Sequence, residues 1–394
     1  MEPKIRFIGH KSNWSVVALD KVTTARNASN ALVNNRNLLS LSYGKIVNKD
    51  IDSNKGLLPS SFSTYQIIEP DTIVFRGTDL QNDKRSLRVA ISKQKGIISP
   101  AYVTMDVTDE NILPDYLYLA MHWHDVAKKS YYKMGDGLRQ TLPYSVLKEL
   151  EIPFPNKSEQ QGIIAYFQKF DAKLQASAKK VESLKKLKSA SLVAMFPQQG
   201  KTTPKVRFKG FEGEWSTSNL GSIFAERIES NENGEMLSVT MNNGIIRSSD
   251  NGRFDNSNSD KSKYKVVKIG DIAYNSMRMW QGASGVSQYE GIVSPAYTVV
   301  TPRIDVDTDF FGYLFKTDDV IRLFKLNSQG LTSDNWNLKY PAFSRICVSY
   351  PKSKEEQQAI ATFFRSLDRK IALETARLEK LKQIKLACLD KMFV

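Results

Sequence analysis

Apolar residues recur at steps of three, four and seven along two long segments of the chain, residues 158–196 and 356–393. In the first segment they are Ile163, Phe167, Phe170, Leu174, Val181, Leu184 and Leu187. In the second segment they are Ile360, Phe364, Leu367, Ile371, Leu378, Leu381 and Cys388. This spacing predicts a single apolar stripe on each of two long helices. Each helix would span about 57 Å, so it needs a partner along most of its length.

The two stripes match, and we expect the helices to pack on each other as an intramolecular coiled coil. The expected packing residues are Phe167, Leu174, Val181 and Leu184 on the first helix, and Phe364, Ile371, Leu378 and Leu381 on the second. Both segments open with Glu-Gln-Gln and close with Met-Phe. The alternative is a pair of ordinary core helices, which repetition over this length disfavours.

The ends of the first helix carry the expected signals. Ser158 with Gln161 fits a capping box, and Pro197 stops the run. The entry to the second helix differs, because one more residue separates Pro351 from Gln357 than separates Pro155 from Gln160. A cap at Ser353 with Glu356 is therefore left open.

The repetition extends over the rest of the chain and defines two copies of one unit. Pro-Lys-Ile-Arg-Phe at 3–7 matches Pro-Lys-Val-Arg-Phe at 204–208, and Gly-Ile-Ile-Ser-Pro-Ala-Tyr at 96–102 matches Gly-Ile-Val-Ser-Pro-Ala-Tyr at 291–297. We expect strands at 72–76, 101–105, 271–275 and 296–300, and helices at 115–130 and 310–326. The predicted organisation is a globular domain at 1–155, a helix at 156–197, a linker at 198–203, a second domain at 204–350 and a helix at 351–394.

Composition adds a partner class. The 394 residues carry a net charge of +14, and the isoelectric point is near 9.4. This balance favours a polyanion such as nucleic acid, although a merely solvated basic surface is the alternative. Two cysteines allow no disulfide framework. We expect no signal peptide and no membrane span, and a cytoplasmic location.

The loops between the matched pieces differ, which suggests one task performed on two targets. Arginine, asparagine and glutamine can read base edges, and lysine holds phosphate. We expect DNA contacts from Arg76, Lys84, Arg85, Arg278 and Gln281. The alternative for any one of them is an ordinary exposed polar turn.

No catalytic constellation and no metal site emerges from the motifs. His122 and His124 are two apart on an expected helix, so they do not share a face for metal ligation. The chain has no phosphate-binding loop, and neither cysteine has a nearby histidine. These observations favour a recognition or scaffolding protein over an enzyme.

The repeated motifs resemble those of the DNA-specificity subunit of type I restriction-modification enzymes. The Gly-Ile-Val-Ser-Pro-Ala-Tyr segment at 291–297, with its first copy at 96–102, resembles a signature of its target recognition domains. The Glu-Gln-Gln openings resemble the start of its spacer helices. The resemblance covers essentially the whole chain. It implies an α+β fold with two similar mixed α/β target recognition domains, related by an internal pseudo-twofold repeat and joined by two long helices in an antiparallel coiled coil.

The resemblance also implies a function and partners. Each recognition domain would read one half of an asymmetric bipartite site in double-stranded DNA, while the helices set the spacer and dock two methyltransferase subunits. Restriction and translocase subunits would join them, and the assembly would act as an adenine-specific DNA methyltransferase and ATP-dependent endonuclease. S-adenosylmethionine, ATP and Mg²⁺ would belong to those partners, and none to this chain. The alternative is a helical scaffold or adaptor protein with non-specific DNA affinity.

Overall fold

The computed structural model describes residues 3–32, 37–50, 58–59, 61–78, 87–126, 141–241, 243–251, 260–332 and 335–393. The chain forms two compact units. The first unit comprises Met1–Ala178 together with Ala376–Val394, and the second comprises Lys179–Thr375. Helices α3 (Lys157–Met195) and α8 (Lys354–Met392) each begin in one unit and end in the other.

The first unit is built on a four-stranded antiparallel sheet with the order β2-β9-β6-β7. The strands of this unit are β1 (Ser15–Ala18), β2 (Thr23–Ala25), β3 (Leu39–Ser42), β4 (Lys45–Asn48), β5 (Gln66–Ile68), β6 (Ile73–Phe75), β7 (Val89–Ile91), β8 (Gly96–Ile98), β9 (Val103–Val107) and β10 (Glu151–Phe154). Its short helices are η1 (Leu19–Lys21), α1 (Pro114–Val126) and α2 (Tyr144–Leu147). The pairs β1-β10, β3-β4 and β5-β8 form separate two-stranded ladders.

The second unit repeats this topology with the order β12-β19-β16-β17. Its strands are β11 (Ser216–Asn219), β12 (Phe224–Glu226), β13 (Leu237–Thr240), β14 (Gly244–Arg247), β15 (Lys265–Val267), β16 (Ile272–Asn275), β17 (Ser284–Val286), β18 (Gly291–Val293), β19 (Tyr297–Pro302) and β20 (Cys347–Tyr350). Its helices are α4 (Leu220–Ile223), η3 (Ser248–Asn251), η4 (Met279–Gln281), α5 (Thr308–Leu314), α6 (Asp318–Asn327) and α7 (Tyr340–Phe343). The predicted fold class, two like units with mixed strands and helices and two long helices, is confirmed.

Each long helix ends by inserting an aromatic ring into the core of the unit that it reaches. Phe393 at the end of α8 packs edge-on against Trp14 in the first unit, with ring centroids 6.3 Å apart. Phe196 at the end of α3 packs in the same way on Trp215 in the second unit, at 6.0 Å. Burying a phenylalanine side chain contributes about 1.5–3 kcal/mol. The closing Met-Phe of each repeat therefore anchors the helix at its far end.

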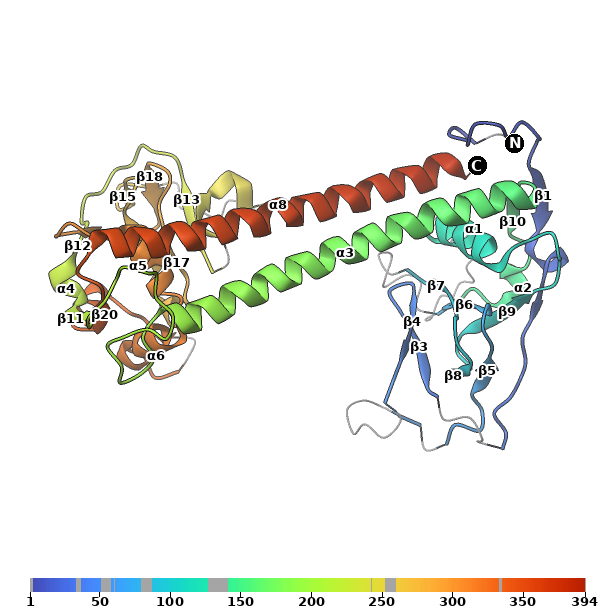
Figure 1. Cartoon of the computed structure of the whole chain (residues 1–394), viewed down its shortest axis with the longest axis horizontal. Helices are drawn as coiled ribbons and strands as arrows, with labels where there is room; N and C mark the ends of the chain where they lie inside the picture. The colour runs from blue at the N-terminus through green and yellow to red at the C-terminus, as the bar shows by residue number, and fades with distance from the viewer. Residues whose placement is uncertain are drawn as a thin grey trace. The chain divides into compact units, whose positions relative to one another are not determined.

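Within each unit the two long helices lie side by side and antiparallel (Figure 1). Lys385 pairs with Asp171 in the first unit. In the second unit Lys180 pairs with Glu374, and Lys188 with Asp368. In the second unit, the position in α8 falls as the position in α3 rises, which is the pattern of an antiparallel pair.

The residues expected to pack between the helices occupy the inner faces to different degrees. Phe167, Val181 and Phe364 are buried. Leu174, Leu184, Ile371, Leu378 and Leu381 are half-buried. Leu187 was expected in the stripe, but it is 49% exposed. Lys188 lies at the helix–helix contact instead, because its ammonium reaches Asp368 on the facing helix.

The first turns of the long helices are capped by side chains that precede them. Asn156 Oδ1 accepts the N–H of Glu159 at 3.0 Å, so Asn156 caps α3, and the predicted cap at Ser158 is wrong. Ser353 Oγ accepts the N–H of Glu356 at 3.2 Å and caps α8. Asparagine outside the helix leaves Ser158 free to sit in the first turn.

The Glu-Gln-Gln opening ties each helix to its own unit. Glu159 forms two hydrogen bonds with Arg6, at 2.7 and 2.8 Å. Glu356 does the same with Arg207, at 2.7 Å each, and also accepts the indole N–H of Trp215 at 3.3 Å. Both glutamates are almost completely buried. The repeated Pro-Lys-x-Arg-Phe segment therefore supplies the partner of the repeated glutamate.

The middle glutamine of each opening binds backbone groups. Gln160 accepts the N–H of Leu113 at 2.9 Å and donates to the carbonyls of Asn111 and Pro155. Gln357 accepts the N–H of Asp307 at 2.8 Å and donates to the carbonyl of Pro351. These bonds hold the helix start against the segment that leads into α1 or α5, so the helix direction is fixed relative to its own unit.

One predicted helix is interrupted. The segment 310–326 was expected to be continuous, but α5 ends at Leu314 and α6 begins at Asp318. No glycine or proline causes the break. Thr317 Oγ1 accepts no bond from α6 and instead donates to the carbonyl of Leu314 at 2.7 Å. In the first unit α1 is described to Val126, and residues 127–130 of its predicted range lie outside the described residues.

We predict that Arg207→Ala destabilises the second unit by about 3–5 kcal/mol, because it leaves the buried Glu356 carboxylate without its cation. Urea denaturation of the full chain measures the change. Lys209→Ala, an exposed lysine in the same segment, is the matched control and should have little effect. An Arg207→Ala midpoint equal to that of the control would show that the pair adds nothing to stability.

Candidate nucleic-acid interface

A polar cleft of about 540 Å³ opens on the first unit. Three segments form it: the β3-β4 hairpin, the loop after β6, and the Ser-Pro-Ala-Tyr turn that leads into β9. Its lining includes Ser40, Ser42, Lys49, Arg76, Thr78, Ser99 and Tyr102. Two cationic side chains among hydroxyl groups match the donors that contact phosphate and base edges in DNA complexes.

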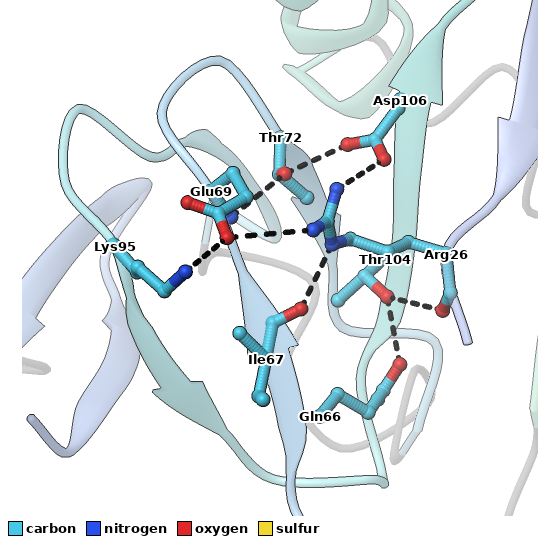
Figure 2. Close-up of polar contacts among 8 residues, drawn as sticks. All are labelled: Arg26, Gln66, Ile67, Glu69, Thr72, Lys95, Thr104 and Asp106. Carbon is cyan, nitrogen blue, oxygen red and sulfur yellow. Dashed lines mark hydrogen bonds and ion pairs between the residues drawn. The ribbon is translucent and has the colours of Figure 1, made fainter. Parts of the chain in front are cut away.

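The Ser-Pro-Ala-Tyr turn that borders this cleft is held by hydrogen bonds from Gln66 of β5. Its amide donates to the carbonyls of Ser99 and Tyr102, at 3.2 and 2.8 Å. Thr104 of β9 in turn donates to Gln66 Oε1 at 2.7 Å (Figure 2). The repeated motif therefore has a defined backbone position, and Tyr102 is presented beside Arg76.

Figure 2 shows the charged network that braces the same sheet. Arg26 directly follows β2. Its guanidinium lies 2.6 Å from Asp106 and 3.8 Å from Glu69, and it donates to the carbonyl of Ile67 at 2.8 Å. Thr72 donates to the other oxygen of Asp106 at 2.7 Å. These ion pairs offset the desolvation cost of the partly buried guanidinium. Arg26 therefore stabilises the sheet and does not line the cleft.

In the second unit, the carboxylate that pairs with the equivalent arginine comes from a different strand. Arg227, the counterpart of Arg26, forms two hydrogen bonds with Asp271, at 2.7 and 2.9 Å. Asp271 stands at the position of Thr72, at the entry to the central strand β16. The carboxylate has thus moved from β9 to the start of β16 while the arginine stays in place.

The loops of the second unit carry different side chains at the corresponding edge. Trp280 contacts Trp336 edge-on at 5.2 Å, and the Lys325 ammonium lies 5.4 Å from the centre of the Trp336 ring. The indole N–H of Trp280 donates to the carbonyl of Met277 at 3.0 Å. Aromatic rings and a cation replace the hydroxyl-lined cleft of the first unit.

The structure places the predicted DNA contacts at these edges in part. Arg76 lines the cleft. Arg278 precedes η4 and is exposed, and Gln281 ends η4 and is half-buried. Lys84 and Arg85 lie outside the described residues. The contact assignments themselves remain predictions.

Strand register establishes which residue of the second unit corresponds to Arg76. Phe75 pairs with Val103, so Arg76 follows β6 next to Tyr102. In the second unit Asn275 pairs directly with Tyr297 at the end of β16. Asn275 is therefore the counterpart of Arg76. The expected strands 72–76 and 271–275 end at these two residues, and the strand pairing shows that they occupy the same position.

The described residues contain no group of three or more histidine, cysteine or acidic side chains arranged to hold a metal ion. Both His122 and His124 are buried in α1. Across the described helices, none combines the length and apolar character that a membrane crossing requires.

Comparison with known proteins identifies the family. The model of the type I restriction modification DNA specificity domain matches residues 12–186 and again residues 212–383. Because these matches cover most of the chain, the protein belongs to this family, as its repeated motifs predicted. A comparison with curated proteins finds no match.

Two solved structures share the fold. The S subunit of a type I restriction-modification system from M. genitalium has a TM-score of 0.58 and 18% sequence identity, covering 100% of this chain and 99% of that chain. A structure from work on complex assembly and conformational transition of the type I restriction-modification system has a TM-score of 0.55 and 16% identity, covering 97% and 98%. At these identities the likeness extends to the fold.

We predict different effects for the two cations of the cleft. Arg76→Ala should relax one base position and cost about 1–3 kcal/mol, since a guanidinium can read a base edge through two donors. Lys49→Ala should weaken all duplexes alike and reduce the slope of affinity against salt by about one. Binding titrations at several salt concentrations measure both effects.

Lys21→Ala removes an exposed lysine that lines no part of the cleft, and it serves as the control. If Arg76→Ala and Lys49→Ala both behaved like this control, the cleft would not be a DNA-binding surface.

Proposed function

We propose that this protein is the non-catalytic, sequence-specific DNA-binding subunit of its restriction-modification assembly, and that each unit reads one half of an asymmetric bipartite site. The observation that carries the proposal is a common scaffold with unlike edges. Both units have the same strand order and the same Glu-Gln-Gln docking. Yet Arg76 stands in one where Asn275 stands in the other.

Arginine and asparagine recognise different bases. Arginine pairs most often with the O6 and N7 atoms of guanine, and asparagine with the N6 and N7 atoms of adenine. Two like units with different readers would bind two different half-sites. The net charge of +14 supplies the sequence-independent attraction to phosphate that accompanies such reading.

The long helices would fix the distance between half-sites and dock two methyltransferase subunits. A continuous α3 supports the first role, because it passes from the first unit into the second without a break. An apolar groove on the second unit supports the second role, because a contiguous exposed apolar surface is typical of a site that a partner covers.

This groove near the end of α3 has a volume of about 310 Å³. It is lined by Ala190, Ala194, Met195, Val206, Phe208 and Phe363.

In this proposal, the methyltransferase and the restriction and translocase subunits supply the chemistry. S-adenosylmethionine, ATP and Mg²⁺ then act in those partners.

We predict that the two units specify their half-sites independently. Replacing residues 204–350 with the same region of a family member should change one half of the methylated site and preserve the other. Methylome sequencing of cells that carry the chimaera and its methyltransferase decides this. A simultaneous change in both halves would refute independent reading.

We also predict that the helices act as a ruler. Four residues inserted after Ala178 and four after Thr375 add about 6 Å to each helix, close to two base pairs, and nearly one helical turn. The apolar stripes stay almost in phase, so the same half-sites should be methylated with a spacer longer by one or two base pairs. Insertions of two residues rotate each stripe by about 200° and should abolish activity. Full activity at an unchanged spacer would exclude the ruler.

A further inference from the structure

Lys316 occupies the break between α5 and α6 and uses all three of its N–H donors on backbone oxygens. Its ammonium donates to the carbonyls of Gly282 at 2.5 Å, Ser284 at 2.8 Å and Met241 at 3.3 Å. A lysine has three such donors and no acceptor. The hydrogen bonds are charge-assisted, which makes them about twice as strong as bonds between neutral groups.

The three carbonyls belong to two loops at the edge of the second unit. Met241 lies in the turn between β13 and β14, and Gly282 and Ser284 lie where η4 leads into β17. The β13-β14 turn and the start of β17 touch through their backbones, since a Cβ built on Gly285 would lie 2.8 Å from the Cα of Gly244. One ammonium therefore joins two loops that already meet without side chains between them.

The loop on the η4 side also packs against helix α6, and Met279 of η4 is buried in the core of the second unit. Arg278 O accepts the N–H of Ala283 at 3.1 Å, so the loop closes on itself. Gly282 adopts a φ of +81°, and a Cβ there would lie 3.2 Å from the Ile321 side chain of α6. Arg278 is exposed at the tip. Moving the base of this loop would therefore move Arg278 and Trp280 together.

In the first unit a different cation binds the loop after β6. Arg88, 1% exposed, donates to the carbonyl of Thr78, at 2.6 Å, in the loop after β6. Its backbone N–H donates to Asp125 of α1 at 2.6 Å. Strand register makes Ala283 the counterpart of Arg88, because Val89 pairs with Phe75 and Ser284 with Tyr274. The second unit has Ala283 at this position, and the cation that binds its loop carbonyls is Lys316, between α5 and α6.

We infer that Lys316 is a positioning residue for DNA specificity in the second unit: it fixes the β13-β14 turn and the η4 loop so that their side chains meet one half-site in a single geometry. The inference rests on the proposed function, because it takes these loops to face DNA. Base reading requires side chains placed to within fractions of an ångström, so a released loop should lose discrimination before it loses affinity.

The side chain of Lys316 stays mostly charged at neutral pH, although its site disfavours the charge. Burial, together with the charge of Lys188, lowers the pKa of Lys316 to about 8. The three carbonyl dipoles are the groups that face the ammonium and offset its desolvation.

The test uses the full chain with the methyltransferase of its own system, in a host without adenine methylation, whose genome is the probe. Lys316→Met keeps the side-chain length and removes the donors, Lys316→Arg restores a cation with donors, and Lys352→Met removes an exposed lysine of the same unit. Thermal unfolding of each purified variant reports whether the chain is folded. Methylome sequencing reports the base preference at each position of both half-sites.

We expect Lys316→Met to lower discrimination by roughly tenfold at one or more positions of a single half-site, the one assigned to the second unit by exchange of residues 204–350. The other half-site should stay intact, Lys316→Arg should recover part of the preference, and Lys352→Met should match the wild type.

Three results would overturn the inference: an unchanged motif, reduced methylation at an unchanged motif, or equal relaxation of both half-sites. The second result would reduce Lys316 to general support of the fold. If the Lys316→Met variant does not fold, the same comparison is made with Lys316→Gln, with Lys316→Arg again as the variant expected to recover the preference. A wild-type chain that directs methylation to no defined motif would instead refute the proposed function itself.

Discussion

A helix of 39 residues with one apolar stripe cannot bury that stripe against a single small domain. It needs a second helix, and this chain supplies one from its own repeat. The far ends of both helices are also committed, because Phe196 and Phe393 complete the cores of the units that they reach. Removing the end of either helix would take a buried phenylalanine out of one of the two cores.

The near ends are committed in a different way. Burying the carboxylates of Glu159 and Glu356 is unfavourable unless each is paired, and Arg6 and Arg207 pair them through two bonds each. Such a pair adds more to orientation than to stability, since its geometry admits one direction of approach. The helix therefore leaves its unit in a defined direction. A subunit that measures the separation of two half-sites requires this property.

The edges of the two units diverge on top of this common base. The arginine of the sheet is neutralised by Asp106 in one unit and by Asp271 in the other. A loop carbonyl is met by Arg88 in one unit and by Lys316 in the other. The arginine–carboxylate pair is thus kept with its carboxylate at a different position, and each unit has a cation that binds loop carbonyls, although not the same ones. Loops supported in this way can vary in sequence without loss of position, which suits a scaffold that must recognise different DNA sequences.

The sequence by itself determined the two long helices, the two units and the family, because periodicity and internal repetition are visible along the chain. It also singled out Arg76, which lines the cleft of the first unit. Only the tertiary structure decided which polar groups find partners: Arg6 with Glu159, Lys188 in place of Leu187 at the helix contact, and Lys316 at an unpredicted helix break. It also showed that Asn275 corresponds to Arg76. The partner of a charged or donor group is usually distant in sequence, so the folded structure is needed to find it. A stripe of apolar residues on a helix follows from the spacing of neighbouring residues alone.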